Sequence, residues 1–325
     1  MPHLEKYWDT GTFLTEALTL EAKRAIDESL SMERPFFLYF SHYALHAPFQ
    51  ADPRFLKNYD PKGKSKDALA FATLVEGMDR SLGDVMDFLE KRGIAENTII
   101  LFLGDNGSDS PFGGSNNIGS SAPLRGKKGA KWEGGIRVPF IAAWAKPNAE
   151  NRFQKRFPIG RNMVHPSWGT CYDLFPTVAA ITGASIPKDW KVDGVNLLPA
   201  LASRDYAMPK RFFLSHFPHS HRSNYFSTLR EGHWKIVRQY DPQKQLSGGK
   251  TVDQLYNIIA DISESNNLAE KNPKQLEHMQ KLLDEALREH GALLPRPPTQ
   301  EELDEQRLKA ERRRRQQAAR RKAAK

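Results

Sequence analysis

The sequence contains very little cysteine. Its 325 residues include only Cys171, which alone can form neither an intrachain disulfide nor a cysteine-based zinc site. Long apolar stretches are missing as well, because no uninterrupted apolar run reaches the length of a membrane span, and residues 1–10 lack the basic-then-apolar layout of a signal peptide. We therefore expect no membrane span and no signal peptide within these residues.

Excess positive charge is absent from most of the chain. The formal net charge is +9, but residues 311–325 hold eight basic residues against one acid, a net +7, which leaves 9 − 7 = +2 for the other residues. A nearly neutral body does not offer a polyanion-binding surface, so we expect no specific nucleic-acid partner. Residues 293–325 are predicted to form a charged basic tail, either an exposed helix or a disordered segment, with adhesion to an anionic surface as an alternative role.

Apolar periodicity predicts alternating helices and strands in the first part of the chain. Apolar residues between 67 and 92 recur at alternating steps of four and three, which places them on one helical face. A continuously apolar, β-branched segment such as 98–103 is typical of a strand covered by helices on both faces of a parallel sheet. Helices are predicted over 18–30 (with Thr19 as N-cap), 67–92 and 173–182, and strands over 36–40, 98–103 and 138–144. This alternation indicates a doubly wound α/β fold, in which functional residues follow the carboxyl ends of the strands.

A different pattern begins after residue 204. Short alternating strands are predicted over 212–216, 225–230 and 233–238, followed by a helix over 273–290. We therefore divide the chain into a main domain (1–204), an antiparallel-sheet and helix subdomain (205–292) and the basic tail (293–325).

Two strand ends carry polar residues that suit an anion or a cation. Asp105 and Asn106 follow the strand at 98–103, and a carboxylate beside an amide oxygen is suited to Ca²⁺ or Mg²⁺, although the same residues followed by glycine also form ordinary turns. His46 follows the strand at 36–40 and is a candidate to hold an anionic ligand or to protonate a leaving oxygen, since histidine is a common general acid and base. His42 is its competitor in the same loop, and nothing local chooses between the two.

A basic loop supplies a third candidate. Lys127 and Lys128 lie between Gly126 and Gly129, and glycines let the backbone approach a ligand while ammonium groups neutralise sulfate or phosphate oxygens. A solvated basic loop is the alternative interpretation.

Four segments occur in the order in which the sulfatase family has its motifs. They are PFFLYFSHYALHAPF, ALAFATLVEGMDRSLGDVMDFL, TIILFLGDNGS and LRGKKGAKWEGGIRVPFI, and weaker similarity extends the match over most of residues 10–290. The chain thus resembles the arylsulfatase-type sulfuric ester hydrolases. This resemblance implies an alkaline-phosphatase-like α/β/α sandwich, incomplete on its N-terminal side, with a smaller C-terminal α+β subdomain that contains an antiparallel sheet.

The resemblance also implies roles for four residues. Asp105 and Asn106 match metal ligands, normally of calcium, with magnesium as an alternative. His46 matches the histidine that contacts the sulfate ester near its leaving oxygen, and Lys128 matches the lysine that holds sulfate and stabilises the departing alcohol. Both are thus expected catalytic and substrate-binding residues, and Lys127 is a rival for Lys128.

The family's nucleophile has no counterpart in its expected place. Sulfatases use a formylglycine made within Cys/Ser-x-Pro-x-Arg, which belongs upstream of residue 35 together with a paired-aspartate metal arm. Cys171 lacks the following proline and arginine, and we interpret it as a packed helix residue. The letters SAPLR at 121–125 fit the serine form but follow the metal pair, where the family has no nucleophile.

The resemblance therefore implies a parent enzyme that hydrolyses sulfate monoesters of aryl or carbohydrate compounds by a calcium-assisted formylglycine mechanism, in the periplasm or after secretion. A sulfated small molecule or glycan is the expected partner. Because this chain shows no nucleophile and only half of the metal site, we expect it to be inactive alone. Two alternatives stay open, namely a non-catalytic remnant or sulfated-glycan-binding module, and a related metal-dependent phosphatase or phosphodiesterase.

Overall fold

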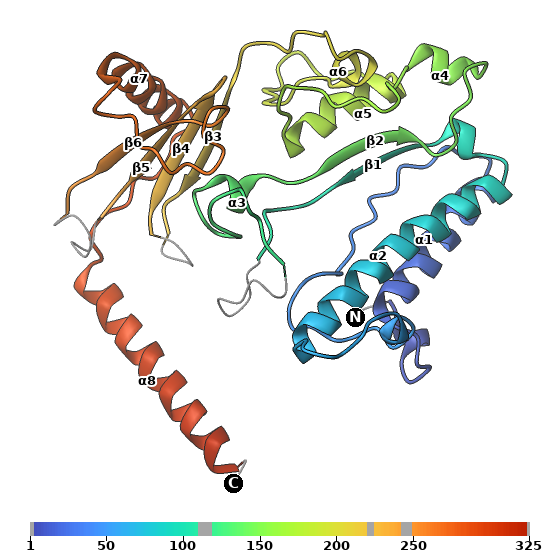
Figure 1. Cartoon of the computed structure of the whole chain (residues 1–325), viewed down its shortest axis with the longest axis horizontal. Coiled ribbons are helices and arrows are strands. Elements are labelled where there is room, and N and C mark those ends of the chain that lie inside the picture. Colours follow the sequence, from blue (N-terminus) through green and yellow to red (C-terminus); the bar gives the residue numbers. More distant parts are fainter. Residues whose placement is uncertain (1–2, 110–118, 220–223, 242–248, 324–325) are drawn as a thin grey trace. The chain divides into compact units, whose positions relative to one another are not determined.

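The computed structural model describes residues 3–109, 119–219, 224–241 and 249–323. The chain divides into two compact units, of which unit 1 comprises residues 1–120 and 138–209, and unit 2 comprises residues 121–137 and 210–325 (Figure 1). The basic loop at 121–137, which lies inside the sequence-based domain 1–204, thus belongs by its contacts to unit 2. Among the described residues, no helix is both long and apolar enough to cross a bilayer.

Unit 1 combines helices with a two-stranded sheet. Its helices are α1 (Leu14–Ser31), α2 (Lys66–Lys91), α4 (Arg152–Arg156), α5 (Leu174–Thr182) and α6 (Leu198–Ala202), and its strands are β1 (Ile99–Leu103) and β2 (Phe140–Trp144). The helix predicted over 67–92 is confirmed, and Val85 and Leu89 of its predicted apolar face are buried against Ile26 of α1, whereas Val75 of that face is exposed. The Ser65 hydroxyl caps α2 by accepting the Ala68 N–H at 3.1 Å.

The predicted start of α1 is wrong. Thr19, expected to be the N-cap, lies inside the helix and is buried. Its hydroxyl donates to the Thr15 carbonyl at 2.7 Å and is 2.6 Å from the Ser81 hydroxyl of α2. A threonine that bonds back to the preceding turn is compatible with a helix interior, so this residue type does not by itself mark a helix start.

Strand β1 has an antiparallel neighbour. Ile99 lies opposite Trp144 and Leu103 lies opposite Phe140 in the register with β2. The expectation of parallel neighbours is therefore wrong for this pair, because an apolar run reports burial and not strand direction. Residues 36–40, predicted as a strand, have no regular secondary structure and are not assigned to either sheet.

Cys171 is also placed differently from the expectation. It is exposed and begins a short 3₁₀ turn before α5 instead of packing inside a helix. The buried residue of that turn is Asp173, whose carboxylate accepts the N–H groups of Thr170 at 2.7 Å and Val195 at 2.9 Å.

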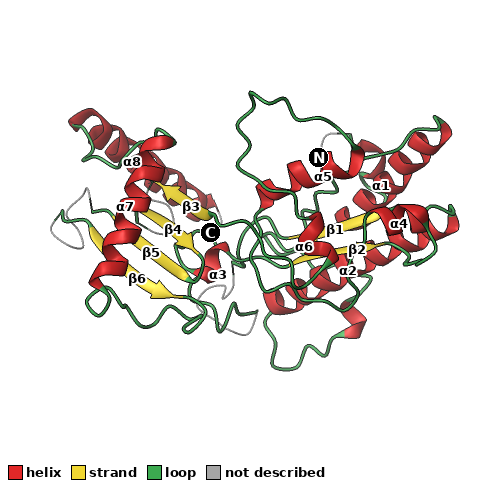
Figure 2. Cartoon of the chain, turned by 90° about the horizontal axis from the view of Figure 1, so that it is seen from above, coloured by secondary structure: helices red, strands yellow, loops and turns green. Residues whose placement is uncertain are grey.

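Unit 2 is built on an antiparallel sheet. Its elements are α3 (Glu133–Ile136), β3 (Phe212–Phe217), β4 (Phe226–Glu231), β5 (Trp234–Gln239), β6 (Val252–Asn257), α7 (Pro273–Glu289) and α8 (Gln300–Ala323), with the strands in sequential order (Figure 2). Met279 and Leu283 of α7 pack on Leu229, Ile236 and Leu255 of the sheet. The predicted strands and covering helix are present, and β6 is an additional strand.

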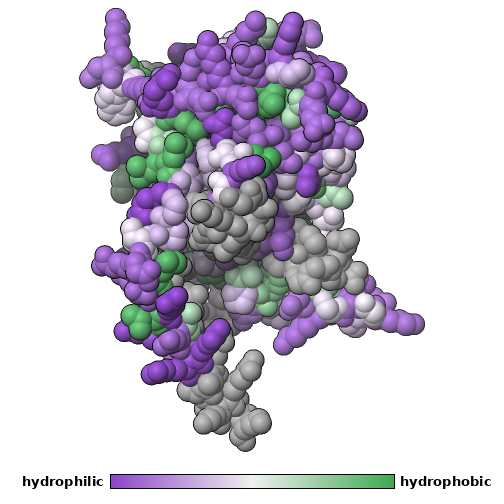
Figure 3. Space-filling view, turned by 90° about the vertical axis from the view of Figure 1, so that its left-hand side faces the viewer, coloured by the Kyte–Doolittle hydropathy of each residue, from purple (hydrophilic) through white to green (hydrophobic). Residues whose placement is uncertain are grey.

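The surface of this part of the molecule is largely polar. In the face shown in Figure 3, hydrophilic residues predominate and hydrophobic ones form small separate groups. Most of the basic tail forms α8, and its described arginines Arg296, Arg307, Arg312, Arg314 and Arg315 are exposed. The side chains of Arg313, Arg320, Arg321, Lys322 and Lys325 lie outside the described residues.

Candidate functional site

The predicted metal pair lies directly after β1. Gly104 brings the chain close to the start of β2, since a Cβ at this position would lie 3.2 Å from Val138, and its N–H donates to the Pro139 carbonyl at 3.3 Å. Asp105 and Asn106 follow in exposed positions. The Asn106 amide nitrogen donates to the Gly107 carbonyl at 3.0 Å, which leaves its oxygen as an acceptor. The Asp105 carboxylate makes no hydrogen bond or ion pair with any described residue.

These two donors do not complete a calcium site. Calcium takes six to eight oxygen ligands, whereas the pair supplies one carboxylate and one amide oxygen. Within the described ranges, no group of three or more His, Cys, Asp or Glu residues is arranged to hold a metal ion. The pair has ligand chemistry suited to calcium, and no such group of acidic, histidine or cysteine residues accompanies it among the described residues, so calcium binding stays a prediction.

The contacts distinguish the two histidines of the strand-end loop. The Thr19 hydroxyl donates its proton to the Thr15 carbonyl, so its oxygen accepts the hydrogen bond from the Ser81 hydroxyl. A hydroxyl has only one proton to donate, so Ser81 cannot also donate to His42. Ser81 therefore accepts from His42 Nε2–H at 3.1 Å, and burial lowers the pKa of the His42 imidazole. His42 is thus committed to packing against α2.

His46 is available for a ligand. It is exposed, and its Nδ1–H donates to the Ala47 carbonyl at 2.6 Å, which leaves Nε2 as the acceptor of the neutral ring. The Tyr43 ring lies 5.7 Å from it, centroid to centroid. No hydrogen bond joins His46 to Asp105 or Asn106, all three of which are described.

The predicted sulfate-binding lysine lies at the corner of a tight turn in unit 2. The Ala130 N–H donates to the Lys127 carbonyl at 2.8 Å, and Gly129 has φ +83°. These values are those of a type II turn, which requires φ > 0 at its third residue and so accounts for the glycine. Lys128 is the second of the four residues of this turn, and it makes no hydrogen bond or ion pair with any described residue. Lys127, the first residue of the turn, has an interaction besides the hydrogen bond from Ala130. Lys128 therefore has an ammonium group without a partner among the described residues, and Lys127 stays its rival for the sulfate-binding role.

Two glycines of α3 hold this turn in place. A Cβ at Gly134 would lie 2.5 Å from the Gly126 carbonyl oxygen, and one at Gly135 would lie 2.4 Å from the Ala130 oxygen and 2.7 Å from the Lys127 oxygen. Real Cβ atoms do not approach backbone atoms so closely. The Gly-Gly pair therefore allows α3 to pack directly against the lysine turn.

A buried ion cluster fixes α3 to the sheet. Lys235 of β5 is 2% exposed, and its ammonium lies 2.9 Å from Glu133 and 2.7 Å from Glu264. The Glu133 N–H also donates to Glu264 at 2.7 Å, and Arg137 reaches the second Glu133 oxygen at 3.0 Å. Burial opposes the ionisation of Glu133, but the nearby cations Lys235, Arg137 and Arg230 outweigh it and hold the Glu133 pKa below its usual value. For Glu264 burial is the larger effect, and it raises the pKa of that carboxyl group.

Cations and an aromatic ring adjoin the same turn. The Arg125 guanidinium lies 3.7 Å from the Trp132 ring centroid and donates to the Glu264 carbonyl at 2.8 Å. Lys131 is buried, has no ion pair among the described residues, and lies 5.1 Å from the same ring. Burial, and secondarily Arg125, lower the Lys131 pKa. The sequence did not predict that Arg125, Lys131 and Trp132 lie together beside the turn of Lys128. The density of basic residues from 125 to 131 was the sequence feature that pointed to such a group of cations.

The serine of the SAPLR segment has a distinct environment. The Ser121 Oγ is buried and finds no hydrogen-bond partner among the described residues. Ser121 lies in unit 2, seven residues before Lys128 in sequence. His46, Asp105 and Asn106 belong to unit 1, so a meeting of these residues with Lys128 around one ligand stays a prediction.

Comparisons with known proteins give a consistent picture. The sequence model of the sulfatase family matches residues 1–184. A sulfatase from Formosa agariphila is 29% identical over 300 residues, covering 82% of this chain and 48% of that protein. The N-acetylgalactosamine-6-sulfatase of Canis lupus familiaris is 35% identical over 188 residues, covering 58% and 32%.

A solved structure agrees with the sequence matches. The crystal structure of Ps i-CgsB in complex with k-i-k-neocarrahexaose is 28% identical, has a TM-score of 0.69, and is matched over 92% of this chain and 60% of that one. The chain belongs to the sulfatase family. Its fold is of the alkaline-phosphatase-like α/β type of that family, as expected, and the chain spans about a third to a half of the length of the relatives named above.

Proposed function

We propose that this chain is part of an enzyme that hydrolyses sulfate monoesters, with sulfated carbohydrates as the substrate class. The observation that carries the proposal is membership of the sulfatase family through a match that includes the segments bearing His46, Asp105, Asn106 and Lys128. The match to Ps i-CgsB, a protein solved with a carrageenan oligosaccharide, supports a carbohydrate substrate.

Each available side chain has a role suited to its chemistry. The Lys128 ammonium, which has no described partner, neutralises a sulfate oxygen and stabilises negative charge that develops on the ester. The His46 ring keeps its Nδ1–H on the Ala47 carbonyl, so Nε2 is the nitrogen that would face a ligand; in the protonated ring its N–H would donate to the leaving oxygen and pass the proton to it. Asp105 and Asn106 contribute two ligands to calcium, which would supply polarisation of the sulfate oxygens when bound.

The nucleophile is expected to come from sulfatase sequence outside this chain. The proposal therefore assigns substrate contact to this chain and the covalent step to a formylglycine elsewhere in the enzyme. It predicts no turnover by the 325 residues alone.

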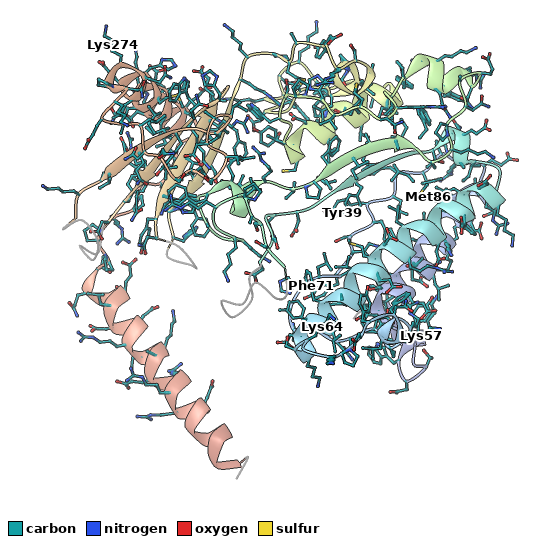
Figure 4. All side chains as sticks on the ribbon, in the orientation of Figure 1. Tyr39, Lys57, Lys64, Phe71, Met86 and Lys274 are labelled. Atoms are coloured by element: carbon teal, nitrogen blue, oxygen red, sulfur yellow. The ribbon has the colours of Figure 1, made fainter. Side chains whose placement is uncertain are left out.

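Activity measurements test this assignment. A gene extended to restore the Cys-x-Pro-x-Arg segment should release sulfate from an aryl sulfate in a calcium-dependent manner. Lys128→Ala and His46→Ala should each lower kcat/KM by a factor of about 10² or more, as is usual for loss of a group acting in the transition state, whereas exposed Lys274→Ala on α7 (Figure 4) should not. Absence of calcium-dependent sulfate release by the restored enzyme would refute the proposal, and faster turnover of phosphate esters would favour the phosphatase alternative.

A second candidate function is sulfated-glycan binding without catalysis. The observation that favours it is the set of cations around the turn, with Lys128 and Lys131 both lacking an ion-pair partner among the described residues. Calorimetry with sulfated and desulfated carrageenan oligosaccharides separates the two functions, because a binding module retains sulfate-dependent affinity in the 325-residue chain and shows no turnover after extension.

A further inference from the structure

Lys131 is a nearly buried cation without a partner. The residue is 9% exposed, and its ammonium group makes no hydrogen bond or ion pair with any described residue. The Lys131 Nζ atom itself is not fully enclosed. The stem of the side chain is therefore packed into unit 2, while a ligand can reach the charged end from solvent.

The ring beside Lys131 is held by the sheet of unit 2. The Lys131 ammonium lies 5.1 Å from the centroid of the Trp132 ring. That ring packs against Val237 of β5, Tyr256 of β6 and Ile258, and it meets the Tyr256 ring edge-on with the centroids 5.6 Å apart. Because these partners belong to the sheet or follow it directly, the place of the cation is fixed by the fold.

The charges around this ring do not neutralise Lys131. The Arg125 guanidinium lies 3.7 Å from the centroid of the same ring and adds a second positive charge. The buried carboxylates of Glu133 and Glu264 both face Lys235, and Arg125 donates to the main-chain carbonyl of Glu264. Burial, followed by repulsion from Arg125, lowers the Lys131 pKa, as expected of a cation that has no anion beside it.

The unbalanced charge decides what kind of ligand fits. Burying an ammonium group without a partner costs free energy, and an anion beside it offsets that cost. A neutral sugar hydroxyl accepts a hydrogen bond but leaves the positive charge unbalanced. A compact oxyanion such as a sulfate group accepts charge-assisted hydrogen bonds from an ammonium and a guanidinium group at the same time.

The lysine turn brings this cation close to Lys128. Lys127 and Ala130 are the ends of the turn, and the Cα atoms at the two ends of such a turn lie within about 7 Å of each other. Lys131 follows Ala130 directly, and Lys128 also has an ammonium group without a partner among the described residues. Two such cations three residues apart suit a ligand that carries more than one sulfate group.

We propose that Lys131, with Arg125 beside it, forms a second sulfate-binding site next to the Lys128 turn, so that unit 2 recognises a carbohydrate that carries at least two sulfate groups. The choice of sulfate over another oxyanion rests on the proposed function, whereas the anion site itself rests on the contacts within unit 2. The site gives Lys131 a role in selecting substrates by their degree of sulfation.

Chemical labelling tests the anion site directly. The full 325-residue chain is treated briefly with acetic anhydride, which acetylates unprotonated amines, in inorganic sulfate or in sodium chloride of the same ionic strength. Mass spectrometry then follows each lysine. Sulfate should slow the acetylation of Lys131 by a factor of about five or more relative to chloride, because a bound anion shields the amine and keeps it protonated. Exposed Lys274 on α7 should react equally in both salts.

Two sulfated probes test the ligand class. Calorimetry compares a carrageenan disaccharide that carries one sulfate group with one that carries two. The parent chain should bind the disulfated probe more tightly by a factor of about ten or more, as expected from one additional charge-assisted contact. Lys131→Met keeps the stem and removes the charge, so it should lose this preference and keep its urea midpoint, since it leaves no group unpaired. Lys274→Met should keep the preference.

Three results would overturn the proposal. They are acetylation of Lys131 that sulfate and chloride slow equally, equal affinity of the parent chain for the two disaccharides, and an unchanged preference for the disulfated probe in Lys131→Met. None of these measurements uses turnover. A restored enzyme that releases no sulfate would therefore refute the proposed function and leave the protection of Lys131 by sulfate in place.

Discussion

Removal of the Lys235 ammonium tests whether the buried ion cluster holds the lysine turn. Lys235→Met keeps a similar length and apolar stem but leaves Glu133 and Glu264, both almost fully buried, without their shared cation. Breaking a buried pair by removing one partner destabilises a protein by about 3–5 kcal/mol. Since domains are stable by about 5–15 kcal/mol, we expect a large decrease in the urea midpoint of unit 2, and fast amide exchange at Ala130, which closes the turn.

The pH dependence and a control make this prediction specific. Without the ammonium, the two carboxylates in Lys235→Met gain protons more readily, so the difference from the parent chain should shrink as pH falls from 7 to 5. Lys274→Met on the exposed face of α7 should change stability by less than about 0.5 kcal/mol. A loss below about 1 kcal/mol in Lys235→Met, or the same loss in both variants, would contradict the anchoring role of the cluster.

Three further outcomes are expected. Gly135→Ala should destabilise unit 2 by about 1–3 kcal/mol in urea titration because its Cβ meets backbone oxygens, whereas Gly83→Ala in α2, where nothing lies within 4 Å, should stabilise unit 1 by up to about 1 kcal/mol. Hydrogen bonds from Lys6 and then from the Tyr7 hydroxyl lower the pKa of Glu21 to about 2. The stabilisation that ionised Glu21 gives the folded chain is therefore complete above pH 4.5 and is lost as pH falls from 4.5 to 2, and thermal melts of Glu21→Gln should lack this acid-dependent loss of stability. Mass spectrometry should find Ser121 as unmodified serine, and an aldehyde there would place the nucleophile in this chain.

The sequence was informative where a local pattern determines the structure. The alternating steps of four and three predicted a helix over 67–92, and α2 spans Lys66–Lys91. The same local reasoning could not predict the antiparallel pairing of β1 with β2, because apolar content does not encode which strands are neighbours. It placed Thr19 at a helix start because threonine is a common cap, whereas its bonds to Thr15 and Ser81 depend on the packing of α1 on α2.

The candidate site shows the same division. Family motifs indicated His46, Asp105, Asn106 and Lys128, each of which is found in a loop or turn. The cluster that supports Lys128 was not predicted, because Glu133 and Glu264 are 131 residues apart in sequence and meet only in the folded unit. No spacing rule connects residues so distant.

Each available side chain lies close in sequence to a residue that is committed to the fold. His46 follows His42, which bonds to Ser81 on α2, and Lys128 precedes Glu133, which is tied to the sheet through Lys235. The committed residues are buried or half-buried, whereas neither His46 nor Lys128 makes a hydrogen bond or an ion pair with the side chain of any described residue. Substituting the committed residue should therefore lower stability and disturb the loop, whereas substituting its neighbour should change ligand binding alone. This separation of stability from function is expected of loops that carry binding groups on a rigid scaffold.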